Sequence, residues 1–170
     1  MAELLVAFPG AQRALFRKYH IGGCSSCGFQ PTETVRGLCE RNGNLDSSEV
    51  LGYVRAAHEE DQKALIQPTE LRDWLRDGVP VRLLDIRSRE EWDAARIAGA
   101  VLMTNPLMQE ILTRWPRDQV VVVYDHLGLH ALDAAAYFAG HGLPLMRALR
   151  GGIDAWSREI DPQVPRYRFD

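Results

Sequence analysis

The stretch VVVVYDHLGLHALDAAAYFAG, residues 120–140, decides the fold. It opens with an apolar run at 120–124, passes through a short segment centred on Gly128, and continues into an alanine-rich stretch. A continuous apolar run of this length is typical of a strand buried on both faces, whereas alanine favours helix. The pattern predicts a strand, a glycine loop and a helix, a layout that normally displays a catalytic or binding group.

Apolar runs alternate with helical stretches on both sides of this segment, from Ile66 onward. Predicted strands lie at 81–86, 100–103, 120–124 and 145–149, and predicted helices at 69–77, 89–94, 106–114, 129–141 and 152–158. Right-handed crossovers between parallel strands place the helices on both faces of one sheet. Residues 66–170 are therefore predicted to form a three-layer α/β domain. Asp85 and Asp125 each end a strand, so they should face the same rim, where such sheets bind ligands.

Residues 1–58 show helical periodicity instead. Ala11, Leu15 and Tyr19 share one face, and the pair Asp46 and Glu49 resembles a capping box before a further helix. The charged stretch 56–65 has no strand pattern, and we place the domain boundary within it. We expect a small all-α domain ahead of the α/β domain.

Composition excludes several classes of function. Hydrophobic residues make up 46% and charged residues 25%, as in ordinary globular domains. The net charge of −3 and the lack of a basic run argue against nucleic acid as a partner. No stretch approaches the roughly 20 apolar residues of a membrane span, and no signal peptide is visible, so we expect a cytoplasmic protein without a membrane partner. The odd count of cysteines, Cys24, Cys27 and Cys39, favours a redox or metal role over a disulfide framework.

Three segments in order, DIRSREEWDAARIAGAV (85–101), VVVYDHLGLHA (121–131) and LRGGIDAW (149–156), resemble the rhodanese, or sulfurtransferase, homology domain. The resemblance implies a rhodanese-like α/β/α fold with a five-stranded parallel sheet. It also implies that the loop 125–130 wraps a cradle of backbone N–H groups at a helix N-terminus. Such groups, together with the helix dipole, attract anions.

The loop departs from the pattern of active members of that family. They place a cysteine where this chain has Asp125, and usually an arginine where it has His130, while the glycine is kept as Gly128. A carboxylate cannot take up a sulfane sulfur reversibly, because no stable oxygen–sulfur linkage is available. We therefore expect Asp125 to fill the cradle itself and expect no thiosulfate sulfurtransferase activity here. The pseudo-active-site loop consists of Asp125, His126, Leu127, Gly128, Leu129 and His130.

Two other interpretations of this rim remain open. His126 and His130 are four positions apart and could bind a metal if both lay on one helical face. Asp85 and Arg87 could orient a substrate, although such a pair more often fixes a loop by charge-assisted hydrogen bonds.

The segment KYHIGGCSSCGFQPTETV (18–35) is the second place where chemistry could occur. Its glycines permit the tight backbone that Cys24 and Cys27 need to form a disulfide or share a metal. Pro31 and Thr32 suit the start of the next helix, which would place the thiols near its positive end and lower a thiol pKa.

Residues 4–54 resemble the hybrid-cluster-associated redox disulfide domain, through the run PGAQRALFRKYHIGGCSSC (9–27) and the helices after it. The resemblance implies a redox-active pair. We expect Cys24 to attack or carry sulfur and Cys27 to resolve the intermediate. In a competing interpretation, Cys24, Cys27 and Cys39, with His20 or a partner's ligand, bind an iron–sulfur cluster or zinc. Cys39 lies on an apolar helical face, which favours a place in the core.

These observations predict a thiol redox or sulfur-handling protein that works through its CxxC dithiol without a bound cofactor. The rhodanese-like domain would be a binding module for a protein thiol or sulfur-transfer partner, or for a small anionic sulfur compound. The alternative is an accessory or scaffold protein that holds iron–sulfur or zinc through its cysteines.

Overall fold

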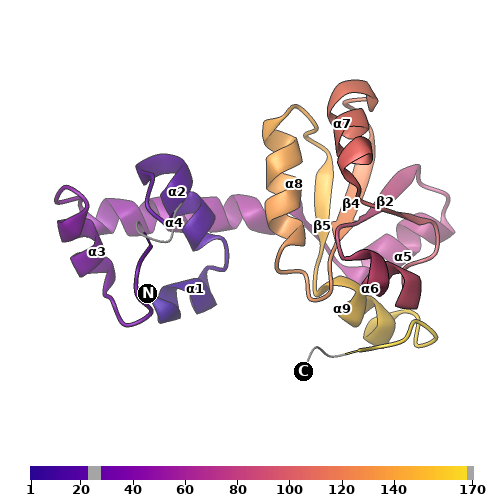
Figure 1. Cartoon of the computed structure of the whole chain (residues 1–170), viewed down its shortest axis with the longest axis horizontal. Coiled ribbons are helices and arrows are strands. Elements are labelled where there is room, and N and C mark those ends of the chain that lie inside the picture. Colours follow the sequence, from indigo (N-terminus) through magenta and orange to yellow (C-terminus); the bar gives the residue numbers. More distant parts are fainter. Residues whose placement is uncertain (23–27, 168–170) are drawn as a thin grey trace. The chain divides into compact units, whose positions relative to one another are not determined.

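The computed structural model describes residues 1–22 and 28–167. The chain divides into two compact units, Met1–Lys63 and Ala64–Asp170 (Figure 1). Each unit has its own hydrophobic core. No helix among the described residues is both long enough and apolar enough to cross a membrane.

The second unit is built on a five-stranded parallel sheet with the order β1-β5-β4-β2-β3. The strands are β1 (Leu65–Ile66), β2 (Val81–Asp85), β3 (Ala100–Leu102), β4 (Val120–Tyr124) and β5 (Met146–Leu149). The expected α/β fold with five parallel strands is confirmed. The residues alone did not indicate β1, because a strand of two residues after a charged helix leaves no period-two pattern to detect.

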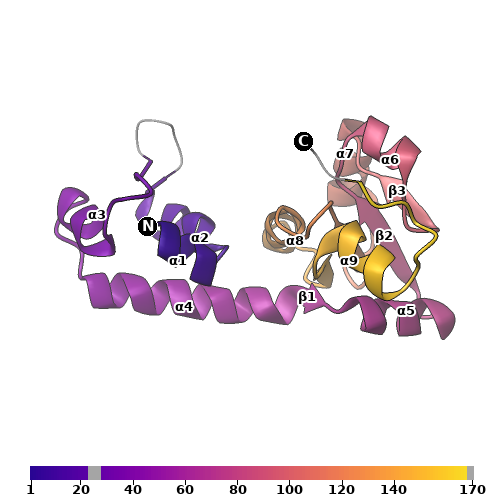
Figure 2. The ribbon, with the colours of Figure 1, turned by 90° about the horizontal axis from the view of Figure 1, so that it is seen from below.

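Helices cover both faces of this sheet (Figures 1 and 2). They are α5 (Pro68–Arg76), α6 (Arg89–Ala94), α7 (Asn105–Arg114), α8 (Ala131–Gly140) and α9 (Gly152–Glu159). Along β4 the side chains alternate, because successive strand residues point to opposite faces. Val122 and Tyr124 pack with α5 and α9, whereas Val121 and Val123 pack with α7 and α8. All four side chains are fully buried, which explains the uninterrupted apolar run.

The first unit is helical, with α1 (Ala2–Ala7), α2 (Ala11–Tyr19), α3 (Val35–Arg41) and α4 (Ser47–Ala64). Its core contains Leu15, Leu38 and Val54 among other apolar side chains. The Asp46 carboxylate accepts hydrogen bonds from the backbone N–H groups of Ser48 and Glu49 and so caps α4. Figure 2 shows α4 as one uninterrupted helix, so the charged stretch that holds the expected boundary is helical as far as Ala64.

Two expected helix starts are wrong, each for a local reason. The helix α8 begins at Ala131 and not at Leu129, because the left-handed Gly128 (φ 80°) and the bonds from the Gly128 and His130 N–H groups to Asp125 hold residues 125–130 in a loop. The helix α3 begins at Val35 and not at Pro31, because the Thr34 hydroxyl is the group that accepts from an N–H of its first turn.

Candidate functional site

The loops that follow β2 and β4 lie side by side at the carboxyl edge of the sheet. Asp85 pairs in register with Tyr124, and the Ile86 N–H donates to the Tyr124 carbonyl at 3.1 Å. Asp85 and Asp125 therefore face the same rim, as the strand ends predicted. This edge is where open parallel sheets bind their ligands.

The Asp125 carboxylate is bound by the backbone of its own loop. One oxygen accepts from the Gly128 N–H, and the other accepts from the His130 N–H at 2.7 Å. The residue is only 6% exposed. The side chain thus satisfies two backbone N–H groups just before the start of α8.

The loop closes over the start of α9, and glycines make this approach possible. The carbonyls of Asp125 and His126 accept from the N–H groups of Ile153 and Asp154, at 2.9 and 3.1 Å. A Cβ on Gly128 would lie 2.7 Å from the Gly151 nitrogen, and a Cβ on Gly152 would lie 2.4 Å from the Asp125 oxygen. The Gly-Gly pair at 151–152 therefore supports the loop, a role that its position far along the sequence did not reveal.

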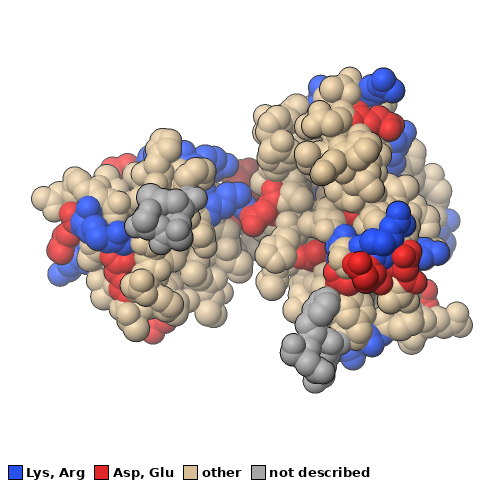
Figure 3. All heavy atoms as spheres, in the orientation of Figure 1, with Lys and Arg blue, Asp and Glu red and all other residues tan. Residues whose placement is uncertain are grey.

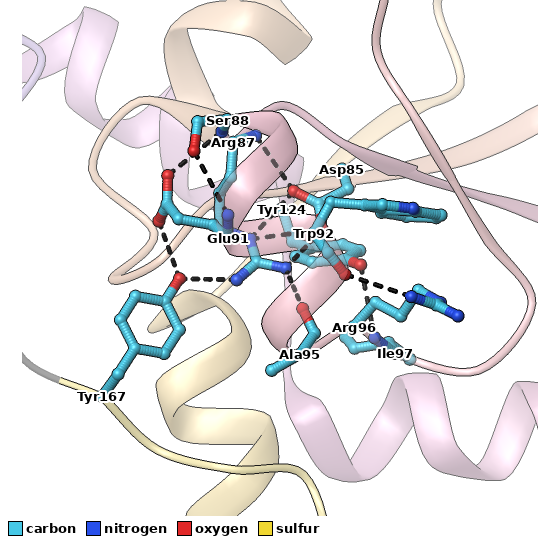
Figure 4. A network of polar contacts seen from close by, with 10 residues as sticks. All are labelled: Asp85, Arg87, Ser88, Glu91, Trp92, Ala95, Arg96, Ile97, Tyr124 and Tyr167. Carbon is cyan, nitrogen blue, oxygen red and sulfur yellow. Dashed lines mark hydrogen bonds and ion pairs between the residues drawn. The ribbon is translucent and has the colours of Figure 1, made fainter.

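Asp85 and Arg87 form a buried ion pair at the end of β2 (Figure 4). The two side chains are 0% and 2% exposed, and their closest atoms, Asp85 Oδ2 and Arg87 Nη2, are 2.5 Å apart. Arg87 also donates to the Ala95 carbonyl at 2.6 Å. A pair with so little solvent access fixes the loop 86–88 and presents little of the guanidinium to a substrate.

Tyr167 joins this network from the C-terminal segment. Its hydroxyl accepts from Arg87 Nη1 at 2.5 Å and donates to Glu91 Oε1 at 2.7 Å (Figure 4). Its ring lies against the His126 imidazole, with 4.4 Å between centroids. Sequence reasoning missed Tyr167, because no pattern near the C-terminus connects it with residues about 40 to 80 positions earlier.

Burial and hydrogen bonding shift the acidities of this network. Desolvation, reinforced by the hydrogen bond to Glu91, raises the pKa of Tyr167 to about 12. Burial tends to raise the pKa of Glu91, but hydrogen bonds from Tyr167 and the Ser88 N–H outweigh it, so this pKa is lowered. Burial disfavours the charged Arg87, yet the hydrogen bonds to Asp85 and Tyr167 prevail and keep the pKa of Arg87 raised. Arg87 and Glu91 are therefore ionised at neutral pH.

A concave site of about 410 Å³ lies in front of the loop 125–130. Leu127 and Leu129 stand at its rim and are 49% and 63% exposed. The lining residues are Ile86, Arg87, Ser88, Glu91, Asp125, His126, Leu127, Leu129 and His130. Of the predicted loop residues, all but Gly128 line the concave site. The other lining residues belong to the loop after β2 and to the start of α6.

The two histidines do not lie on one helical face. Both precede α8, where His130 is the N-cap residue. Within residues 1–22 and 28–167, no group of three or more His, Cys, Asp or Glu side chains could hold a metal ion. A metal site built on the i, i+4 spacing of His126 and His130 therefore lacks its geometric basis.

The cysteine candidates fall into two sets. Cys24 and Cys27 lie outside the described residues. Cys39 is 2% exposed in the core of the helical unit, and burial, followed by the charges of Asp46 and Glu40, raises the pKa of its thiol. His20 is exposed at the end of α2. A metal ligand needs the thiolate form, whereas the surroundings of Cys39 favour its protonated thiol.

The rhodanese-like domain model matches residues 67–159, more than half of the chain. The chain belongs to the rhodanese-like family. Solved structures agree with the fold: the rhodanese-like domain of an Anabaena protein superposes with a TM-score of 0.51 at 21% identity, over 63% of this chain and 88% of that one.

Curated relatives of this rhodanese-like chain include sulfurtransferases. The probable adenylyltransferase/sulfurtransferase MoeZ of Mycobacterium tuberculosis is 36% identical over 60% of this chain and 26% of its own length. The sulfurtransferase of Allochromatium vinosum is 33% identical over 58% of this chain and 92% of its own length. The adenylyltransferase and sulfurtransferase MOCS3 of Anopheles gambiae is 28% identical over 98% of this chain. The chain spans 41% of MOCS3, so it corresponds to less than half of either adenylyltransferase.

Proposed function

We propose that this protein handles sulfur or redox equivalents through the Cys24–Cys27 dithiol, while its rhodanese-like unit binds a partner without covalent turnover. One observation carries the second half of this proposal. The Asp125 carboxylate accepts from the N–H groups of Gly128 and His130, and the resemblance to active family members implies a thiolate or persulfide at this position. Oxygen offers no reversible bond to a sulfane sulfur, so the covalent step must use a thiol elsewhere in the chain.

The dithiol can carry out that step by ordinary thiol chemistry. The Cys24 thiolate attacks the outer sulfur of a donor persulfide, forms a Cys24 persulfide and releases the donor thiolate. The outer sulfur then passes to an acceptor thiolate, which regenerates the Cys24 thiolate. Alternatively, the Cys27 thiolate attacks the inner sulfur, so that a Cys24–Cys27 disulfide forms and hydrosulfide leaves. A partner dithiol would then reduce the disulfide by exchange and would itself be oxidised.

The relatives support sulfur as the common element, because several of them are named sulfurtransferases. The start of α3 weakens one argument for a reactive thiol. Val35 stands eight positions after Cys27, so the positive end of that helix is not adjacent to the pair in the sequence. The position of α3 in the sequence therefore does not by itself predict a lowered thiol pKa.

The competing function, an iron–sulfur or zinc scaffold, depends on Cys39 as a ligand. That thiol lies in the apolar core of the helical unit. A charged metal centre is unfavourable among apolar side chains. The proposal therefore involves no metal.

Persulfide transfer to the full chain tests this function. We expect mass spectrometry, after treatment with a low-molecular-weight persulfide, to find one added sulfur atom on Cys24, and mild oxidation to consume two thiols. Cys24→Ser should abolish both results, whereas Asp125→Ala should leave them unchanged. Stoichiometric iron or zinc after anaerobic purification, lost in Cys39→Ala, would favour the scaffold. Thiosulfate turnover that survives Cys24→Ser and Cys27→Ser but disappears in Asp125→Ala would refute the proposal.

A further inference from the structure

The concave site in front of the loop 125–130 is lined by more carboxylates than cationic side chains. Among the described residues that line it, Arg87 is the only lysine or arginine, and Glu91 and Asp125 supply two carboxylates. Two backbone N–H groups that could bind an anion are also occupied, because Gly128 and His130 already donate to Asp125.

Arg87 does not restore a positive potential at the surface of the site. Its side chain is 2% exposed, and its guanidinium donates to Asp85, to the Ala95 carbonyl and to the Tyr167 hydroxyl. The adjacent Asp85 carboxylate neutralises its charge at 2.5 Å. Because the guanidinium is 2% exposed and paired with Asp85, this wall offers an incoming anion little access to a cation.

Glu91, by contrast, is held in place as an anion. Its Oε2 accepts from the Ser88 N–H at 3.1 Å in a capping box, and its Oε1 accepts from Tyr167 at 2.7 Å. Each carboxylate oxygen can accept a second hydrogen bond, so the group can still receive a donor from a ligand. Its orientation is set in advance by the fold, so binding would cost little side-chain entropy.

The rim of the concave site adds apolar surface beside the Glu91 carboxylate. Leu127 and Leu129 project from the loop and are half-exposed or more, on either side of the left-handed Gly128. Exposed leucines beside a concave surface are typical of protein-binding sites rather than sites for small, fully hydrated anions.

We infer that the concave site docks a polypeptide segment of a partner in which a lysine or arginine stands beside an apolar residue, and that it excludes small sulfur anions. The cation would pair with Glu91, and the apolar side chain would pack on Leu127 and Leu129. This inference deepens the partner-binding role proposed above for the rhodanese-like unit. It does not depend on the chemistry of the dithiol.

Binding by the ¹⁵N-labelled full chain tests it, with three probes followed in amide spectra at pH 8. The probes are a five-residue blocked peptide with arginine between two leucines, the same peptide with glutamate in place of arginine, and sodium thiosulfate. We expect the arginine peptide to shift amide signals in 86–91 and 125–130 at concentrations where the other probes do not. Added salt should weaken this binding, since it screens the ion pair.

Variants separate the two parts of the interaction. Glu91→Gln should weaken binding of the arginine peptide about three- to fivefold, as expected for a solvent-accessible ion pair. Glu90→Gln makes the same charge change on the neighbouring residue of α6, which does not line the site, and should have no effect. Leu129→Ser should weaken binding about fivefold through lost apolar contact, at a position too exposed to affect folding.

The inference is wrong if thiosulfate or the glutamate peptide shifts the same amides at lower concentration than the arginine peptide, or if neither peptide shifts them. It is also wrong if Glu90→Gln and Glu91→Gln weaken binding equally. The Cys24→Ser and Cys27→Ser variants should bind the arginine peptide as the parent does. Failure of the dithiol chemistry would therefore leave the docking result intact, and failure of docking would leave the dithiol result intact.

Discussion

Two aspartates stand at the carboxyl ends of neighbouring strands, Asp85 as the last residue of β2 and Asp125 directly after β4, and their side chains have opposite roles. Asp85 is fully buried against the guanidinium of Arg87, whereas Asp125 turns back onto the N–H groups of its own loop and lines a concave site. The partner of Asp85 is a full charge whose side chain is 2% exposed. The partners of Asp125 are backbone dipoles next to solvent. The first arrangement holds the fold together and the second shapes a surface, although both residues follow an apolar strand in the sequence.

Breaking the Asp85 pair should have the larger effect on stability. Arg87→Ala would leave a buried carboxylate without its counter-charge, and we expect a loss of about 3–5 kcal/mol in the free energy of unfolding. Urea denaturation measures it. The control is Arg89→Ala, whose partner Asp93 is 3.9 Å away with both side chains more than 60% exposed. That change should cost less than about 1 kcal/mol. Equal losses in the free energy of unfolding for Arg87→Ala and Arg89→Ala would show that the buried pair of Asp85 contributes no more than an exposed pair.

Removing the Asp125 plug should cost less. Asp125→Ala deprives two N–H groups of their acceptor, which we expect to cost about 1–3 kcal/mol, with the lower end favoured because water can enter the concave site. Asp125→Asn keeps one acceptor oxygen and should cost about half as much. Hydrogen exchange at the Gly128 and His130 amides should accelerate in Asp125→Ala. Exchange rates that stay at the parent value would show that the carboxylate does not protect these amides.

The smallest effect should come from Tyr167→Phe, which keeps the ring beside His126 but removes the hydroxyl that links Arg87 and Glu91. We expect a loss of about 1 kcal/mol at pH 7. Between pH 10 and about 12, an unfolded tyrosine ionises while the folded Tyr167 stays protonated, so the free energy of unfolding falls as pH rises.

The variant should show a shallower fall over this window. Tyr124, whose pKa burial also raises, contributes in the same direction in both proteins, so the difference between parent and variant isolates Tyr167. Identical pH profiles would mean that the Tyr167 hydroxyl is not buried in this network.

Much of the fold followed from local pattern. The apolar run at 120–124 and the helical spacing at 89–94 coincide with β4 and α6, because burial on both faces and capping leave signatures within a few residues. The strand β1 and the starts of α3 and α8 did not follow from local pattern, since a two-residue strand carries no period and the helix starts depended on Thr34 and Gly128.

Figure 3 shows acidic and basic side chains interspersed over the face drawn, in line with the mixed charge of the sequence.

The sequence by itself determined that a carboxylate stands where the glycine loop begins. It also determined that the three cysteines of the chain lie in its first quarter. Which atoms that carboxylate contacts was decided only by the tertiary structure. The folded chain brings Gly151 and Gly152 under the loop, Arg87 onto Asp85, and Tyr167 between Arg87 and Glu91. Local periodicity reports which side chains are buried. Pairing between distant residues arises only when packing brings them together and removes the water that would otherwise solvate them.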